Sequence, residues 1–314
     1  MTNRVEWRAD PDWGVRLAAF AALRVLVARE GPVLPWRLIE RGFTHEGRSY
    51  LFANQAKGIF RPAGMRGGAL SIKSIVRRRG PARYLDLASD DLFSYAMQDR
   101  GADYHDNQLL LWCGRTGVPF IYFFGVEPGH YSPIWPVYVQ DVLLPEARVL
   151  IASAPPDAAL HEPGAIVADG AGRTIERRYA TIELKRRLHQ AAFRHLVLGA
   201  YANRCAMCNL PRRALLEAAH ILPDRDHRGL PSVPNGLALC KLHHAAYDAN
   251  LIGVRPDHVV EVSPVLMDES DGPTLEIVLK ALAGRAIRLP RRQSDHPDTA
   301  FLEERYVTFR GMRA

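Results

Sequence analysis

Two short cysteine and histidine pairs constrain the last third of this chain more than any other feature. Cys205 and Cys208 form a C-x2-C pair, and Cys240 and His243 form a C-x2-H pair further along. Thiolates together with an imidazole are ligands that close a tetrahedral zinc site. We therefore predict a structural Zn²⁺ bound by these four side chains. The surrounding segment has few strands and a small core, so the metal is expected to supply folding energy.

The residues between and beside the two pairs carry groups suited to hydrolysis. An apolar strand is predicted over 214–222, and Glu217 and His220 interrupt it. A tight Asn-Gly turn begins at Asn235. His244 directly follows the last zinc ligand, so on a helix it points to a different side. The predicted zinc site would thus hold together a strand histidine (His220), a loop asparagine (Asn235) and a helix histidine (His244).

The stretch from Cys205 to Ile252 resembles the HNH, or ββα-metal, nucleases. The resemblance combines both zinc pairs with an A-H-I strand, an N-G-L-x-L-C turn and an H-H-x-x-Y-D helix, in that order. It implies that His220 is the general base that activates water, which suits a side chain that titrates near neutral pH. It also implies that Asn235 orients this base and that His244 binds one catalytic ion, Mg²⁺ or Mn²⁺. The expected reaction is hydrolysis of DNA phosphodiester bonds.

One position departs from the family's pattern. Many members place a metal-binding Asp or His immediately before the base, where this chain has Ala219. Glu217 lies on the same face of the predicted strand as Ala219, so it is a candidate for the missing metal ligand. The alternative is a carboxylate that hydrogen-bonds to backbone or pairs with an arginine. Asp248 is expected to cap or orient rather than to ligate.

The charge of the chain favours a polyanionic partner. Its 314 residues carry a formal net charge of +7, with a pI of about 9.4, and nucleic acid is the commonest such partner. Arg77, Arg78 and Arg79 are candidate DNA phosphate contacts, although such a cluster is also compatible with a solvated face. The sequence contains no run of eighteen or more apolar residues, so no membrane span is predicted. The N-terminus lacks a signal-peptide layout. A cytoplasmic location is the default expectation.

The order of sequence textures predicts an α+β chain in four parts. An amphipathic helix is expected from Trp13 to Glu30. Short β-branched and aromatic runs, broken by Gly and Pro, predict mostly β structure from Leu34 to about Leu150. Apolar spacing predicts a further helix from Thr181 to Tyr201. The parts are an N-terminal helix (1–32), a mostly-β domain (33–154), a linker (155–180) and a nuclease domain with a C-terminal helical extension (181–314).

The β-rich region from Gly42 to Asp141 resembles the SRA, or YDG, family of modified-cytosine readers. The shared elements are a G-I-x-R-P strand, an A-L-S-I strand, a Tyr-x-Asp step, an F-x-Y strand and a D-N-x-x-L helix. The resemblance implies a curved, PUA-related sheet that flips 5-methylcytosine or 5-hydroxymethylcytosine out of the duplex. It assigns Tyr84 and Tyr95 to the walls of the base pocket and Asp86 to the base edge. Alternatively, both rings pack the core of the sheet.

Together the two resemblances imply a type IV-like, modification-dependent DNA restriction endonuclease. Its β domain would bind modified double-stranded DNA, and its HNH domain would cut nearby. Cutting both strands requires two HNH sites, so a homodimer on DNA is plausible. Two alternatives remain open: an HNH nuclease indifferent to base modification, and a DNA-binding regulator whose nuclease site has decayed. The stretch after Val262 is expected to buttress the nuclease core.

Overall fold

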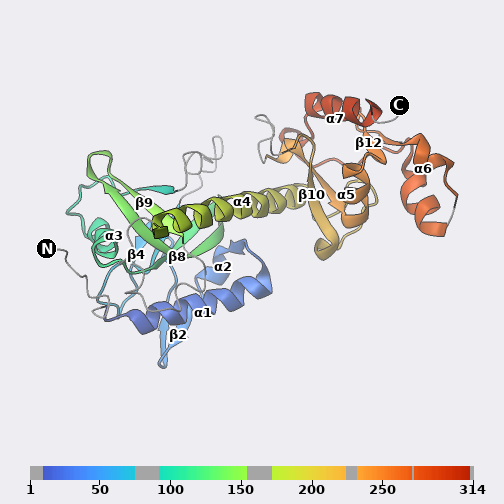
Figure 1. The fold of residues 1–314 in the computed structure, drawn as a ribbon. Helices are drawn as coiled ribbons and strands as arrows, with labels where there is room; N and C mark the ends of the chain where they lie inside the picture. The colour runs from blue at the N-terminus through green and yellow to red at the C-terminus, as the bar shows by residue number, and fades with distance from the viewer. Residues whose placement is uncertain (1–9, 75–91, 154–171, 224–231, 271, 312–314) are drawn as a thin grey trace. The chain divides into compact units, whose positions relative to one another are not determined.

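The structure is a computed structural model that describes residues 10–74, 92–153, 172–223, 232–270 and 272–311. The chain divides into two compact units, Met1–Leu188 and His189–Ala314. Both units contain helices and strands, so the predicted α+β class is confirmed (Figure 1). Among the described residues, no helix is both long enough and apolar enough to cross a bilayer.

The first unit is built on one mixed sheet. Within the described residues, its strands run in the order β4-β5-β7-β8-β9-β6, and β1 joins the edge of β8. β5 and β7 pair in parallel, and the other neighbours pair antiparallel. The strands of this unit, including the separate β2–β3 hairpin, are β1 (Leu34–Pro35), β2 (Phe43–His45), β3 (Arg48–Tyr50), β4 (Ile59–Phe60), β5 (Ser71–Lys73), β6 (Phe93–Ala96), β7 (Phe120–Glu127), β8 (His130–Leu143) and β9 (Arg148–Ser153).

The long strand β8 pairs with two further strands, β1 and β9, at different points along its length. Its first residues, His130 and Tyr131, pair with β1, and its residues from Val137 onward pair with β9. Register shifts interrupt the pairing of β8 with both β7 and β9. Such irregularities leave a residue unpaired and increase the local twist and bend of a strand. The β structure predicted for this region is therefore present as a curled sheet.

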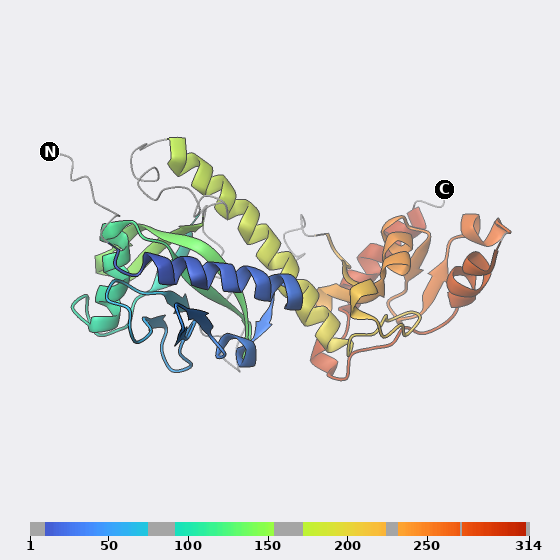
Figure 2. The same ribbon diagram turned by 90° about the horizontal axis from the view of Figure 1, so that it is seen from below.

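Helix α1 (Trp13–Glu30) has the bounds predicted from the sequence. Its buried side chains, among them Phe20 and Leu23, share one core with Ile121 and Phe123 of β7. The short helix α2 (Trp36–Ile39) adds to the same core, and α1 lies beside the sheet in both views (Figures 1 and 2). The N-terminal helix is thus part of the packing of the first unit.

A fully buried arginine fastens α1 to the loops around the sheet. The Nε of Arg16 donates to Asp10 Oδ2 at 2.7 Å, and neither side chain is exposed. Its Nη1 donates to the carbonyls of Ala69 (2.6 Å) and Pro119 (3.1 Å), and its Nη2 donates to that of Gly68 (3.4 Å). A buried charge is tolerated when its partners satisfy it in this way, and it becomes costly when one partner is removed.

Replacing Arg16 with Met is therefore expected to destabilise the first unit by about 3–5 kcal/mol, because Asp10 is left buried without its counter-charge. Urea unfolding followed by circular dichroism measures this loss. Arg24→Met is the matched control, since Arg24 is exposed on the same helix. Equal unfolding midpoints for the two variants would contradict a structural role for the Arg16 pair.

Helix α3 (His105–Thr116) confirms the short helix expected near the D-N-x-x-L motif. The buried amide of Asn107 accepts from the backbone N–H of Gln98 (2.8 Å) and donates to the carbonyls of Gln98 (2.9 Å) and Gly101 (2.8 Å). It therefore ties the start of α3 to the loop after β6. Gly68 passes so close to α3 that a Cβ there would lie 2.5 Å from the Trp112 ring.

Helix α4 (Gly172–Ala200) continues from the first unit into the second. It begins earlier than Thr181, where the apolar spacing predicted its start. In the first unit, Thr181 Oγ1 accepts from Ser153 N at 3.1 Å, and Lys185 Nζ donates to the Leu92 carbonyl at 2.7 Å. In the second unit, Phe193 and neighbouring apolar residues of α4 enter the core.

The second unit contains a β10–β11 hairpin followed directly by α5, and a second hairpin, β12–β13. Helical elements follow toward the C-terminus. The elements are β10 (Leu216–His220), β11 (Gly236–Cys240), α5 (Lys241–Asp248), β12 (Ile252–Val254), β13 (Val260–Val262), α6 (Pro264–Asp268), the π-helix η8 (Thr274–Leu279) and α7 (Thr299–Gly311). Among the described residues, short 3₁₀ turns are η3 (Leu144–Glu146), η6 (Arg213–Leu215), η7 (Val233–Asn235), η9 (Lys280–Leu282) and η10 (Gln293–Asp295).

The C-terminal elements pack onto the ββα core. From α7, Arg305 Nη2 donates to the Tyr247 carbonyl at 2.6 Å, and its guanidinium lies 4.7 Å from the centre of the Tyr247 ring. Gly253 of β12 runs against Phe309 of α7, where a Cβ would lie 2.5 Å from the ring. The end of α5 is thus held by the stretch that the sequence led us to expect as a buttress.

Candidate metal centre and nuclease site

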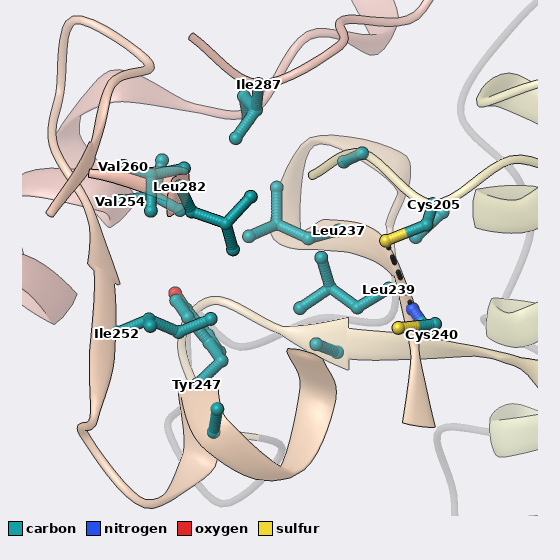
Figure 3. Close-up of a cluster of buried hydrophobic side chains, with 14 of the residues drawn as sticks. Cys205, Leu237, Leu239, Cys240, Tyr247, Ile252, Val254, Val260, Leu282 and Ile287 are labelled. Carbon is teal, nitrogen blue, oxygen red and sulfur yellow. Dashed lines mark hydrogen bonds between the residues drawn. The ribbon is translucent and has the colours of Figure 1, made fainter. Parts of the chain in front are cut away.

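The four predicted zinc ligands converge in the second unit. The Sγ atoms of Cys205, Cys208 and Cys240 and a ring nitrogen of His243 all lie within 4.8 Å of one another. The backbone N–H of Cys240 donates to Cys205 Sγ at 3.3 Å, at the edge of the apolar core (Figure 3). Three sulfurs and one imidazole nitrogen form a donor set that fits Zn²⁺. A zinc ion would join the loop after α4 to the start of α5.

Protons are shared unevenly among these thiols. Hydrogen bonding with Cys205, and then with Cys208, lowers the pKa of Cys240 far below that of a free thiol. Hydrogen bonding with Cys205, and then with Cys240, raises the pKa of Cys208. Metal binding requires thiolates, so an ion that enters the cluster releases the remaining thiol protons.

The orientation of His243 is fixed from outside the cluster. Its Nδ1 faces the sulfurs of Cys205 (3.4 Å) and Cys240 (3.3 Å). Its Nε2 lies 3.0 Å from the carbonyl of Val278, which can only accept a hydrogen bond. Nε2 therefore carries the proton, and the lone pair of Nδ1 is directed to the metal position. Such an outer partner fixes the tautomer and ring orientation of a zinc-binding histidine.

Asn235 pins the chain just beyond His220. Its Oδ1 accepts from Leu222 N at 2.8 Å, and its Nδ2 donates to the Leu222 carbonyl at 3.1 Å. The backbone carbonyl of Asn235 also accepts from Ile221 N at 2.9 Å. Asn235 is fully buried, so these bonds fix the exit of β10 where His220 stands.

His220 ends β10, opposite Gly236 of β11. Its ring lies flat against the ring of Phe193 from α4, with centroids 3.9 Å apart and an interplanar angle of 16°. Phe193 was not singled out by sequence reasoning. Its apolar position in a helical pattern signals a core residue and carries no motif of its own. Its contact with the predicted base is visible in the structure alone.

The structure brings Glu217 and His244 together. Glu217 Oε2 lies 2.7 Å from His244 Nδ1, and Asp248 Oδ2 lies 3.3 Å from His244 Nε2. Both carboxylates therefore flank one imidazole. The neighbouring Ala219 is fully buried in the core. Since side chains alternate along a strand, Glu217 and His220 leave β10 on opposite faces.

The structure describes one of the predicted base-pocket residues. Tyr95 of β6 is almost fully buried, its hydroxyl donates to the Lys73 carbonyl at 3.4 Å, and its ring lies edge-on to Tyr122. Burial raises the pKa of its hydroxyl. Tyr84, Asp86 and the run Arg77–Arg79 lie outside the described residues. The roles of all six residues stay predictions.

A comparison with protein-family models identifies one segment of the second unit. The HNH endonuclease model matches residues 205–255. This segment is an HNH endonuclease domain. It contains both zinc pairs, His220, Asn235 and His244. The prediction that the chain is a metal-dependent DNA endonuclease is confirmed at this level.

Two further comparisons add less. Among solved structures, the chain is similar to a "Modification dependent TagI restriction endonuclease". The two are 17% identical, and the match covers 77% of this chain and 82% of that chain with a TM-score of 0.30. A TM-score this low does not establish a shared fold. No curated protein matches the chain.

Proposed function

We propose that this protein is a modification-dependent, type IV-like restriction endonuclease that cuts double-stranded DNA with its HNH domain. The observation that carries the nuclease half is the ββα arrangement of His220, Asn235 and His244, held together with a separate Cys₃His cluster. The net charge of +7 suits a DNA substrate.

His220 is the proposed general base. It takes a proton from the water that attacks the scissile phosphate, and a histidine is suited to this because its pKa lies near neutral pH. Asn235 holds the backbone directly after the base through both bonds to Leu222. The base therefore stands on a strand end whose position is fixed from two sides.

His244 and Glu217 are the proposed ligands of a catalytic divalent ion. An imidazole nitrogen and a carboxylate oxygen 2.7 Å apart supply donor types that fit Mg²⁺ or Mn²⁺. When bound there, such an ion would supply positive charge to offset the charge that develops on the phosphate and the leaving oxygen. Asp248 Oδ2 lies 3.3 Å from Nε2 and would hold the ring proton there when an ion takes the Nδ1 lone pair. This geometry supports Glu217 as the substitute for the residue that Ala219 replaces.

Reading of a modified cytosine is proposed for the first unit. Its support is the sequence resemblance to the SRA family and the curled sheet, which carries Tyr95 on β6. A flipped base requires aromatic faces for stacking and a group that reads its Watson–Crick edge. Tyr84, Asp86 and Tyr95 remain the proposed pocket residues, and Arg77–Arg79 the proposed phosphate contacts. A homodimer would bring the two HNH sites that cleavage of both strands requires.

Cleavage of three matched plasmids tests this proposal. The plasmids carry cytosine, 5-methylcytosine or 5-hydroxymethylcytosine, and the protein is incubated with each in Mg²⁺ or Mn²⁺. We expect at least one modified plasmid to be cut much faster than the unmodified one. His220→Asn is the catalytic control on each substrate.

Each other outcome favours a different reading. Equal cutting of all three plasmids would identify a nuclease indifferent to modification. Binding without cutting of any plasmid would favour a DNA-binding regulator. Cutting that survives His220→Asn would remove His220 from the role of base.

A further inference from the structure

We propose that Phe193 is a positioning residue for the catalytic base: its ring holds the imidazole of His220 at the angle from which it takes a proton. This inference rests on the proposed role of His220. Phe193 belongs to α4 and lies outside residues 205–255, the segment that the HNH family model matches.

The stacking geometry carries the inference. The two ring centroids are 3.9 Å apart and the planes are inclined by 16°, so the rings touch face to face. The terminal torsion of a histidine is broad, and backbone position alone does not fix the plane of its ring. A flat surface in contact with one face of the imidazole blocks rotation about that torsion. Phe193 is 2% exposed, so its own ring is held by the core.

Gly236 makes room for this stack. It lies directly opposite His220 in the β10–β11 pair, and opposite residues project from the same face of a hairpin. A Cβ on Gly236 would lie 2.9 Å from Phe193 Cζ and 2.5 Å from Val197 Cγ2. The missing side chain therefore lets α4 approach the hairpin closely enough for the two rings to touch.

Val197 offers a control that distinguishes positioning of the His220 ring from general core packing. It is fully buried in the same core, lies one turn further along α4 and packs against the same glycine. Being aliphatic, it offers no flat face to an imidazole. Val197→Ala therefore removes core volume without removing the stack, whereas Phe193→Leu keeps much of the volume and removes the ring.

The experiment measures kcat and KM of the full-length protein on the DNA that the wild type cuts best, together with the midpoint of thermal unfolding. We expect Phe193→Leu to lower kcat about 10- to 100-fold with little change in KM, since small misplacement of a reacting group has effects of this size. Phe193→Met, whose flexible side chain fills irregular gaps, is the second ring-free variant in case the first fails to fold. Val197→Ala is expected to keep its kcat even if its unfolding midpoint falls.

A second readout is independent of activity. The ring protons of His220 lie over the Phe193 face, and their NMR signals should move downfield when that ring is removed. Unchanged kcat in the ring-free variants, or an equal loss in Val197→Ala, would overturn the inference. If the wild type cuts no DNA, the proposed function fails, and unchanged His220 signals in Phe193→Leu would still refute the stack in solution.

Discussion

Replacement of Cys205 with Ser is expected to unfold the second unit while the first unit stays folded. Structural zinc sites contribute about 10–16 kcal/mol of apparent binding free energy at pH 7. A typical domain has a net stability of about 5–15 kcal/mol. Cys205 is buried, and its sulfur also accepts the Cys240 N–H. Loss of this ligand thus removes the metal and a contact inside the core together.

Metal analysis and thermal unfolding measure this effect. The wild type should contain one zinc per chain, and Cys205→Ser much less, with loss of the unfolding transition of the second unit. Cys113→Ala is the matched control, because Cys113 is a buried cysteine in the first unit. It should keep its zinc and shift the transition of the first unit alone. A Cys205→Ser protein with full zinc content and an unchanged second transition would refute the structural role.

Replacement of His220 with Ala is expected to slow DNA cleavage by about 10²- to 10⁴-fold, the usual contribution of a general base. Zinc content should stay unchanged, because His220 is not among the cluster ligands. Binding of Mn²⁺ should also persist, because the proposed ligands, Glu217 and His244, meet on the other face of β10.

Single-turnover cleavage at saturating protein isolates this chemical step. His220→Asn serves as a second variant that retains a flat polar side chain beside Phe193. His105→Ala is the control, since it removes an exposed histidine of the first unit. Near wild-type rates in both His220 variants would assign the base to another residue, as would a comparable loss in His105→Ala.

The metal-binding parts of the site were predictable from sequence because metal ligands occur at characteristic spacings. Three cysteines and a histidine in two short pairs indicated that the four side chains meet at one metal site. Glu217 and His244 were linked through the position that Ala219 vacates, and the strand–helix geometry of the domain brings them to 2.7 Å. Asn235 was expected to orient the base; its two bonds to Leu222 hold the backbone directly after His220, and its role in catalysis stays a prediction.

Other features leave little trace in sequence. Phe193 reads as an ordinary core residue of a helix, because apolar spacing reports burial and not which ring it touches. The partner of His243 is the backbone carbonyl of Val278, and any residue type supplies a carbonyl. In the first unit, the G-I-x-R-P motif indicated a strand where β4 (Ile59–Phe60) lies, but two residues are too few to show which strand they pair with. Its place at the sheet edge follows from long-range pairing with β5.

The contacts around the metal cluster determine how many residues must be transferred to another protein for the nuclease domain to work there. The segment that the HNH family model matches ends at residue 255. Beyond it, the Val278 carbonyl lies 3.0 Å from His243 Nε2, and the backbone N–H of Arg288 donates to the Ala206 carbonyl at 2.7 Å. On the other side, His220 rests on Phe193. A chimaera that contained residues 205–255 alone would keep every proposed metal ligand. It would lose Val278 and Phe193, which contact His243 and His220. The segment needed for a working nuclease is therefore longer than residues 205–255. Chimaeras that keep activity are expected to have their junctions outside residues 189–311.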